Sequence, residues 1–203
     1  MSVGEFWPER FVQSAVWSKQ FRQNSNDALS GSVVVTDHGE PFWRVEFSVE
    51  VPIRTVFVNK WEAFLARREG AKNTFTMNRP FQYSPARSPV VDDTNLIVQS
   101  VSRTNSTVTF AGVEPDYIAG EGDMIGYFTE RSGFYVATVL ADAVSVDGSV
   151  TMKVWPAPFG PHPDTPNPRR RKALGEFKLE SERPVENIST RSWRVVAIQE
   201  VRG

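Results

Sequence analysis

The chain has 203 residues, of which 40% are hydrophobic and 12% aromatic, so one large domain or two small ones can bury a core without disulfides. Its 23 basic and 24 acidic residues nearly cancel, which argues against binding to nucleic acid or anionic membrane through overall charge. Cysteine is absent, which excludes disulfides and thiol catalysis. The first residues lack the pattern of a signal peptide and no apolar run could span a bilayer, so we expect no membrane anchor.

The first thirty residues mix aromatic and polar side chains without a clear period, and the pattern sharpens only afterwards. Residues 42–51 alternate apolar and polar side chains, which predicts an antiparallel strand with one buried face. Thr55 can cap a helix over residues 56–69, and Gly70 suits the left-handed position at its end. The predicted inner face of this helix consists of Phe57, Trp61, Phe64, Leu65 and Arg68.

Further strands are predicted on both sides of this helix. Six prolines between residues 156 and 168, followed by the basic run 169–172, predict an extended loop. Five short predicted strands between residues 96 and 155 favour a small barrel or sandwich. The additional predicted strands are 32–36, 74–78, 96–101, 107–111, 124–128, 134–139, 150–155, 175–180 and 192–200.

Histidine and glycine patterns give little support for an enzyme. Only His38 and His162 occur, in a predicted turn and a predicted loop. The chain therefore offers few histidines for a catalytic triad or a zinc site. Gly120, Gly122 and Gly126 lack the spacing of a phosphate loop and precede a predicted strand, so we interpret them as a β-turn.

Three groups of acidic residues remain as candidates for hydrolytic chemistry. A carboxylate pair could cleave glycosidic bonds if the fold placed its members on either side of a cleft. A hairpin turn at residues 147–148 and a hydrophilic linker at 92–93 are the simpler interpretations. We therefore expect no enzymatic activity, catalytic residue, cofactor or metal. The three groups are Asp92 with Asp93, Glu121 with Asp123, and Asp142 with Asp147.

Aromatic residues are more numerous than a β-rich core of this size needs, with six Trp and fourteen Phe. Tryptophan often anchors protein interfaces, so aromatic residues outside periodic elements are candidate subunit contacts, with ordinary core packing as the equal alternative. The basic run could bind phosphate, but without interleaved aromatics a solvated loop or an ion pair with a neighbour is favoured. The candidate interface residues are Trp7, Trp17, Phe21, Arg169, Arg170 and Arg171.

Several segments follow one another in a distinctive order. The most specific passage runs from Ala63-Phe64-Leu65 through Gly70 to Phe75, from a helix into a strand. The supporting segments are 29–31, 40–45, 119–125, 135–136, 147–152, 155–156 and 175–179. This order, over most of residues 28–180, resembles the distal tail proteins of long-tailed bacteriophages, which form the baseplate hub ring. Glu121 lengthens the usual turn of the family, and the Pro-rich loop is unusually long.

The resemblance implies a mainly β fold: a β-sandwich with one flanking helix plus an inserted small β-barrel. Residues 1–90 and 174–203 would form the ring-forming sandwich with helix 56–69, and residues 91–173 the barrel with its Pro-rich loop. Proteins of this type are made in the host cytoplasm and form a ring, usually a hexamer, in the virion tail. Expected partners are copies of the chain, the tail tube protein, and baseplate hub or tail-tip proteins, with DNA only passing through the channel.

Two other functions stay open at this point. The chain could be a carbohydrate- or receptor-binding module at the tail tip, with sugars held on exposed Trp or Tyr side chains of the barrel. An aromatic groove beside Asp123 would favour that hypothesis. A glycan- or peptidoglycan-cleaving enzyme would need two carboxylates at glycosidase separation.

Overall fold

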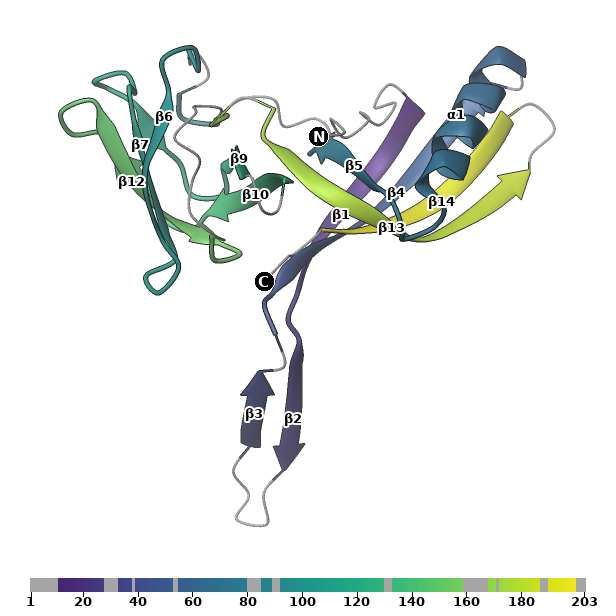
Figure 1. The fold of residues 1–203 in the computed structure, drawn as a ribbon, viewed down its shortest axis with the longest axis horizontal. Helices are drawn as coiled ribbons and strands as arrows, with labels where there is room; N and C mark the ends of the chain where they lie inside the picture. Colours follow the sequence, from purple (N-terminus) through teal and green to yellow (C-terminus); the bar gives the residue numbers. More distant parts are fainter. Residues whose placement is uncertain are drawn as a thin grey trace.

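The described chain is mainly β, with one helix and several antiparallel sheets, which confirms the predicted fold class (Figure 1). Two five-stranded sheets, here called the large and the small sheet, lie side by side and share a junction (Figure 1). The computed structural model describes residues 11–27, 33–37, 39–52, 55–79, 85–88, 92–129, 133–158, 168–170, 172–186 and 190–199.

The large sheet brings together strands from both ends of the chain, because β4 pairs with β14 and β5 pairs with β13. All of its neighbouring strands are antiparallel. In spatial order the strands are β1 (Val12–Gln20), β4 (Phe42–Pro52), β14 (Thr190–Gln199), β13 (Leu174–Glu186) and β5 (Thr74–Asn78).

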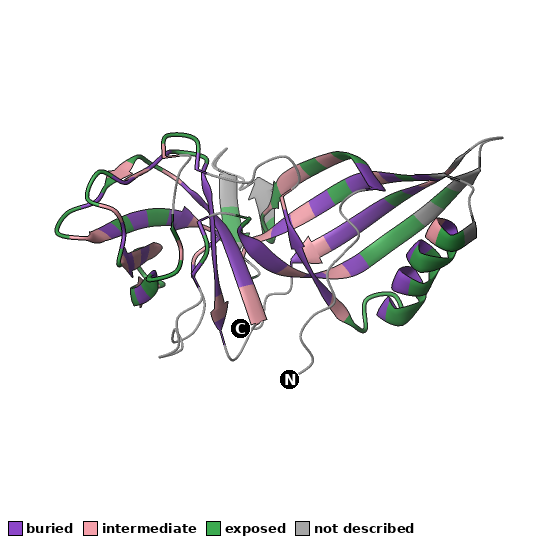
Figure 2. Cartoon of the chain, turned by 90° about the horizontal axis from the view of Figure 1, so that it is seen from above, coloured by how far each residue is buried: buried purple, intermediate pink, exposed green. Residues whose placement is uncertain are grey.

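One face of the large sheet is buried beneath helix α1 (Thr55–Arg68). Along β4, Val45 and Phe47 are buried while Glu46 is exposed, as the alternation predicts. The helix buries the predicted stripe around Trp61 and leaves its other side exposed (Figure 2). The opposite face of the sheet carries mainly polar side chains, so it needs no second layer to cover it.

The small sheet closes around a core of its own, made from residues that are near one another in sequence. It curls in Figure 1. A short two-stranded sheet of β8 (Ile118–Ala119) and β11 (Ala143–Val144) contacts it at β12. The predicted turn at Asp147-Gly148 is confirmed: both residues have positive φ, 49° and 71°. In spatial order the small sheet contains β6 (Ile97–Ser102), β7 (Thr107–Ala111), β12 (Ser149–Trp155), β10 (Gly133–Val139) and β9 (Met124–Thr129).

The two sheets meet where β13 begins. A Cβ atom on Gly126 of β9 would lie 2.9 Å from the backbone oxygen of Leu174, so only glycine allows this approach. Gln199 at the end of β14 donates from Nε2 to the backbone oxygen of Val136 at 3.0 Å. The predicted domain boundary between residues 90 and 91 lies outside the described residues.

A hairpin of β2 (Gln23–Asp27) and β3 (Val33–Asp37) projects away from both sheets, and we call it the arm (Figure 1). It continues from β1 and leads into β4, the outer two strands at one side of the large sheet. Strand β3 corresponds to the predicted strand 32–36, whereas β1 and β2 were not predicted.

Candidate functional site

Trp17 is part of the core of the large sheet. Its ring meets Trp43 edge-on with centroids 5.6 Å apart, and Phe177 with centroids 5.4 Å apart. It lies on the inner side of β1, directly opposite Val45. Of the two interpretations of this residue, the structure supports core packing rather than a subunit contact.

A column of aromatic rings continues from Trp17 to the root of the arm. Trp43 meets Trp155 of β12 at 4.8 Å between centroids, and Trp155 meets Phe21 at 5.6 Å. Because Trp155 belongs to the small sheet and Trp43 to the large one, the column joins both sheets to the arm. Aromatic pairs at such distances add about 0.5–1.5 kcal/mol each beyond their burial.

Phe21 remains an exposed aromatic residue, with 54% of its surface accessible. It lines a hollow of about 400 Å³ at the root of the arm. An ion pair between Arg103 and Glu40 ties this root to the turn after β6, and Lys19 Nζ lies 5.2 Å from the Trp155 ring centroid. The hollow is lined by Phe21, Arg22, Gln23, Gly39, Glu40 and Pro41.

The three predicted arginines do not form one exposed patch. Arg169 is exposed, and its N–H donates to the backbone oxygen of Gly126 at 2.6 Å. Arg170 has a fully buried side chain. Trp7 and Arg171 lie outside the described residues, as do His38 and His162.

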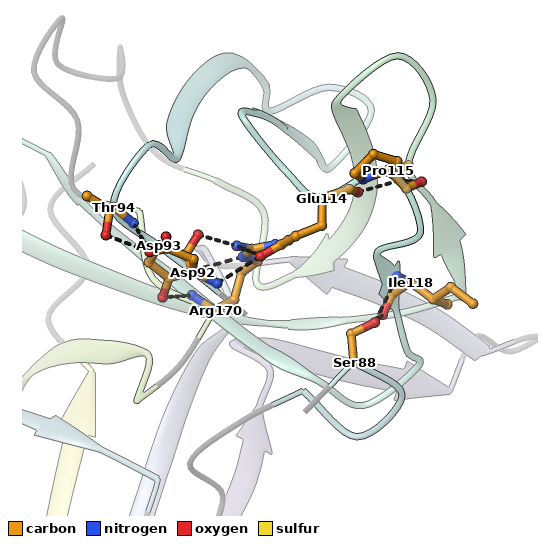
Figure 3. Close-up of polar contacts among 9 residues, drawn as sticks. Ser88, Asp92, Asp93, Thr94, Glu114, Pro115, Ile118 and Arg170 are labelled. Carbon is orange, nitrogen blue, oxygen red and sulfur yellow. Dashed lines mark hydrogen bonds and ion pairs between the residues drawn. The ribbon is translucent and has the colours of Figure 1, made fainter. Parts of the chain in front are cut away.

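Arg170 is held by carboxylates and backbone of its own chain (Figure 3). Its Nε donates to Asp93 at 2.9 Å and its Nη1 to Glu114 at 2.5 Å, while Nη2 donates to the backbone oxygen of Asp92 at 2.8 Å. The guanidinium carbon lies 4.5 Å from the ring centroid of Tyr117. We call these five residues the Arg170 clasp. It fastens the end of the Pro-rich segment to the small sheet.

The clasp is a charged structural element rather than a proton-transfer site. Burial alone would raise the pKa of Glu114, but hydrogen bonds from Arg170 and the Asp92 N–H outweigh it and lower that pKa. Burial holds the pKa of Tyr117 well above its usual value. Every carboxylate of the clasp is matched by a donor, so the clasp presents no unpaired base to solvent.

Two of the other predicted acidic residues, Asp123 and Asp142, are also engaged within the chain. Asp123 is 1% exposed and accepts hydrogen bonds from the backbone N–H groups of Gly120 and Ala86, each at 2.8 Å. Asp142 pairs with Arg87 at 2.9 Å and accepts from the Glu121 N–H at 2.8 Å. These contacts explain Asp123 and Asp142 as loop anchors, and Asp123 is too deeply buried to line an aromatic groove.

A groove of about 490 Å³, which we call the α1 groove, lies between the second half of the helix, the end of β13 and the start of β14. Leu65, Trp193 and Pro184 form its apolar part. Beyond Lys178, β13 pairs only with β14 among the described strands, so the groove opens at a free sheet edge. Its lining residues are Glu62, Leu65, Ala66, Glu69, Gly70, Glu182, Pro184, Arg191, Ser192 and Trp193.

The α1 groove contains three carboxylates, and they differ in their ion pairing. Glu62 pairs with Arg191 at 2.8 Å and Glu69 with Lys72 at 2.6 Å. Glu182 forms no ion pair with any described residue, and partial burial raises its pKa. The groove therefore presents the negative charge of Glu182 beside apolar walls.

Glu182 was missed because the predicted strand ended at residue 180, whereas β13 continues to Glu186. The register also shifts between Leu179 and Ser181, so simple alternation from Glu180 would not have placed Glu182 on the face covered by the helix. The partners of Arg170 were missed for a different reason. Asp93 and Glu114 are 77 and 56 residues away in sequence, and no local pattern connects them to it.

Within the described part of the chain, no group of three or more His, Asp or Glu side chains could hold a metal ion. The helix there lacks the length and apolar character that crossing a membrane requires. Comparison with models of known protein families and with curated protein sequences finds no match for this chain.

Proposed function

We propose that this chain is a non-enzymatic structural subunit of a phage tail, a ring-forming distal tail protein that joins the tail tube to the baseplate hub or tail tip. The observation that carries the proposal is the arm, the hairpin β2–β3 that projects from the body of the protein (Figure 1). The segment order that resembles distal tail proteins supports the same function.

The arm is too small to be stable by itself. Its strands pair with each other and with no other described strand, and Val35 on β3 is 55% exposed. An isolated two-stranded hairpin is at best marginally stable in water, so a projecting one gains most by lying on another chain. A closed ring supplies such a surface, because each copy offers its arm to the next.

The root of the arm is well fixed, which suits a part that must reach a neighbour in a defined direction. The aromatic column from Phe21 to Trp43 and the Arg103–Glu40 ion pair attach it to both sheets. A fixed root lowers the conformational entropy lost on binding. The exposed ring of Phe21 at this root is the contact residue that we propose from the sequence-predicted set.

The described residues do not provide the features that the competing functions need. The binding-module hypothesis requires an aromatic groove beside Asp123, and that carboxylate is instead buried against backbone N–H groups. The hydrolase hypothesis requires two carboxylates facing each other across a cleft, and one member of each predicted pair, Asp93, Asp123 or Asp142, is held by residues of its own chain. In the proposed function the partners are copies of the chain, the tail tube protein and the hub or tail-tip proteins.

The test is the mass of the full chain by light scattering, with negative-stain images of the same fraction, alone and with isolated tail tubes. We expect rings of about six subunits with a central hole, either free or capping the tubes. A matched variant replaces residues 24–36 by a two-residue Asn-Gly turn, and we expect it to fold but not to form rings. A chain that stays monomeric in both conditions at high concentration would contradict the proposal.

A further inference from the structure

Strand β13 connects two oppositely charged sites at its two ends. Before it begins, Arg169 is fixed by hydrogen bonds to the backbone of Gly126 and exposes its side chain. Near its far end, Glu182 lines the α1 groove. The first site offers a cation and the second a carboxylate, and neither has an ion partner among the described residues.

The α1 groove fits the side chain of an arginine. Leu65, Pro184 and Trp193 offer apolar surface to the methylene stem, and the carboxylate of Glu182 offers two acceptors to the planar guanidinium. Arginine is also less strongly hydrated than lysine, so it enters such a partly desolvated site at lower cost.

The occupant cannot be Arg169 of the same chain. Eight residues separate Leu174 from Glu182 along β13, a length of about 26 Å for an extended strand. Arg169 is held on the side of Leu174, next to Gly126. No arginine side chain spans that distance, so the contact has to come from another molecule.

An added β-strand is a poor occupant of the same edge. Pro184 removes one backbone N–H from this part of β13, and Glu182 places a charge beside it. Proline and charge on an edge strand are the usual protection against pairing with a further strand. The edge is therefore suited to receive a side chain.

We infer that the α1 groove of one copy receives Arg169 of the next copy, with the guanidinium of Arg169 on Glu182. This inference rests on the proposed ring. One partner surface lies at the junction of the two sheets and the other in the α1 groove, so the contact joins two different surfaces and is head-to-tail. Head-to-tail contacts generate rings when the rotation between copies closes. The basic run thus takes part in assembly through Arg169, while Arg170 holds the fold together.

The test uses the full chain under the condition in which the wild type forms rings. We expect Arg169→Glu and Glu182→Arg each to raise the protein concentration needed for half-assembly by about tenfold or more, because each places like charges in contact. Glu50→Arg and Arg194→Glu, both exposed on the outer face of the large sheet, are the matched controls and should assemble normally.

Mixing distinguishes a direct contact from a general charge effect. In an equimolar mixture of the two variants, the glutamate introduced at position 169 can meet the arginine introduced at position 182 at every second contact. The native Arg169–Glu182 pair forms at the other contacts, so an even-numbered ring should assemble again. The double variant should also recover. Melting curves of the single variants should match the wild type, since neither residue has an ion partner within the described chain.

Single variants that assemble normally, or a mixture that does not recover, would overturn the Arg169–Glu182 contact and leave the ring itself in place. A wild type that forms no ring under any condition would overturn the proposed function and this contact together.

Discussion

The large and the small sheet are both antiparallel, but they differ in their aromatic residues and in how the chain builds them. The described core of the large sheet contains Trp and Phe, whereas three of the four tyrosines, Tyr117, Tyr127 and Tyr135, lie in the small one. The small sheet uses strands between residues 97 and 155, while the large sheet pairs strands from opposite ends of the chain.

This difference shows how the two regions depend on each other. The small sheet can close through short connections, at low cost in loop entropy. The large sheet forms only when β13 and β14 return to pair with β5 and β4. Folding of the small sheet brings the two ends of the intervening chain together and so shortens this connection. Tryptophan fluorescence therefore reports mainly on the large sheet and tyrosine signals mainly on the small one, so the two can be followed separately.

The strongest way to break the large sheet is Trp61→Ala. Trp61 is fully buried between Phe64, at 5.3 Å between centroids, and Trp193, at 6.1 Å. Its removal should lower the free energy of unfolding by about 4 kcal/mol, measured by urea titration of tryptophan fluorescence. Val56→Ala, exposed on the same helix, is the control. A loss no larger than in that control would refute the core position of Trp61.

The corresponding change in the small sheet is Arg170→Ala, which leaves Asp93 and Glu114 partly buried without their cation. We expect a loss of about 3 kcal/mol, seen first in the tyrosine signal. Arg169→Ala, one residue away but exposed, should change stability by less than about 0.5 kcal/mol. Equal effects of the two substitutions would contradict the different environments of these neighbours.

The junction is tested by Gly126→Ala. The added methyl group would lie about 3 Å from the backbone oxygens of Leu174 and Tyr135, which cannot move independently. We expect a loss of about 2 kcal/mol that appears in both the tryptophan and the tyrosine transitions. Ser100→Ala, at an exposed strand position, is the control. A shift confined to one signal would show that the sheets unfold independently.

The smallest expected effect is on the stability of the small sheet at low pH. The pKa of Glu114 is lowered in the folded protein, so its charged form stabilises the fold above its unfolded pKa of about 4.5, and this contribution is lost as the pH falls through the lowered folded value. In Glu114→Gln, the free energy of unfolding measured from the tyrosine signal should therefore fall less steeply with decreasing pH below about 4.5. Glu121→Gln, at an exposed turn, should leave that profile unchanged.

Local sequence patterns predicted the elements that have one apolar face and one polar face. The alternation around Phe47 and the helical stripe around Trp61 each identify a buried face, and both are confirmed. Strand β1 escaped prediction because Val16 faces outward while Lys19 faces the inner side, next to Trp155. Its position was set by pairing with β4 rather than by its own pattern.

The candidate site was predictable only in part. The basic run is visible in the sequence, but adjacent residues of an extended chain point to opposite sides. Arg169 therefore faces solvent while Arg170 faces Asp93 and Glu114. Whether each arginine is exposed or buried depends on residues far away in sequence, and so does the position of Glu182 beside the helix.

Strand β13 also has a mechanical consequence. It passes from the junction with the small sheet to the α1 groove and is hydrogen-bonded to β14 along most of its length. A pull that slides β13 along β14 loads these hydrogen bonds in shear, so that they share the force and must fail together. A pull across the arm would open β2 from β3 one pair at a time. The chain thus combines a mechanically resistant strand β13 with an arm that opens under a smaller force.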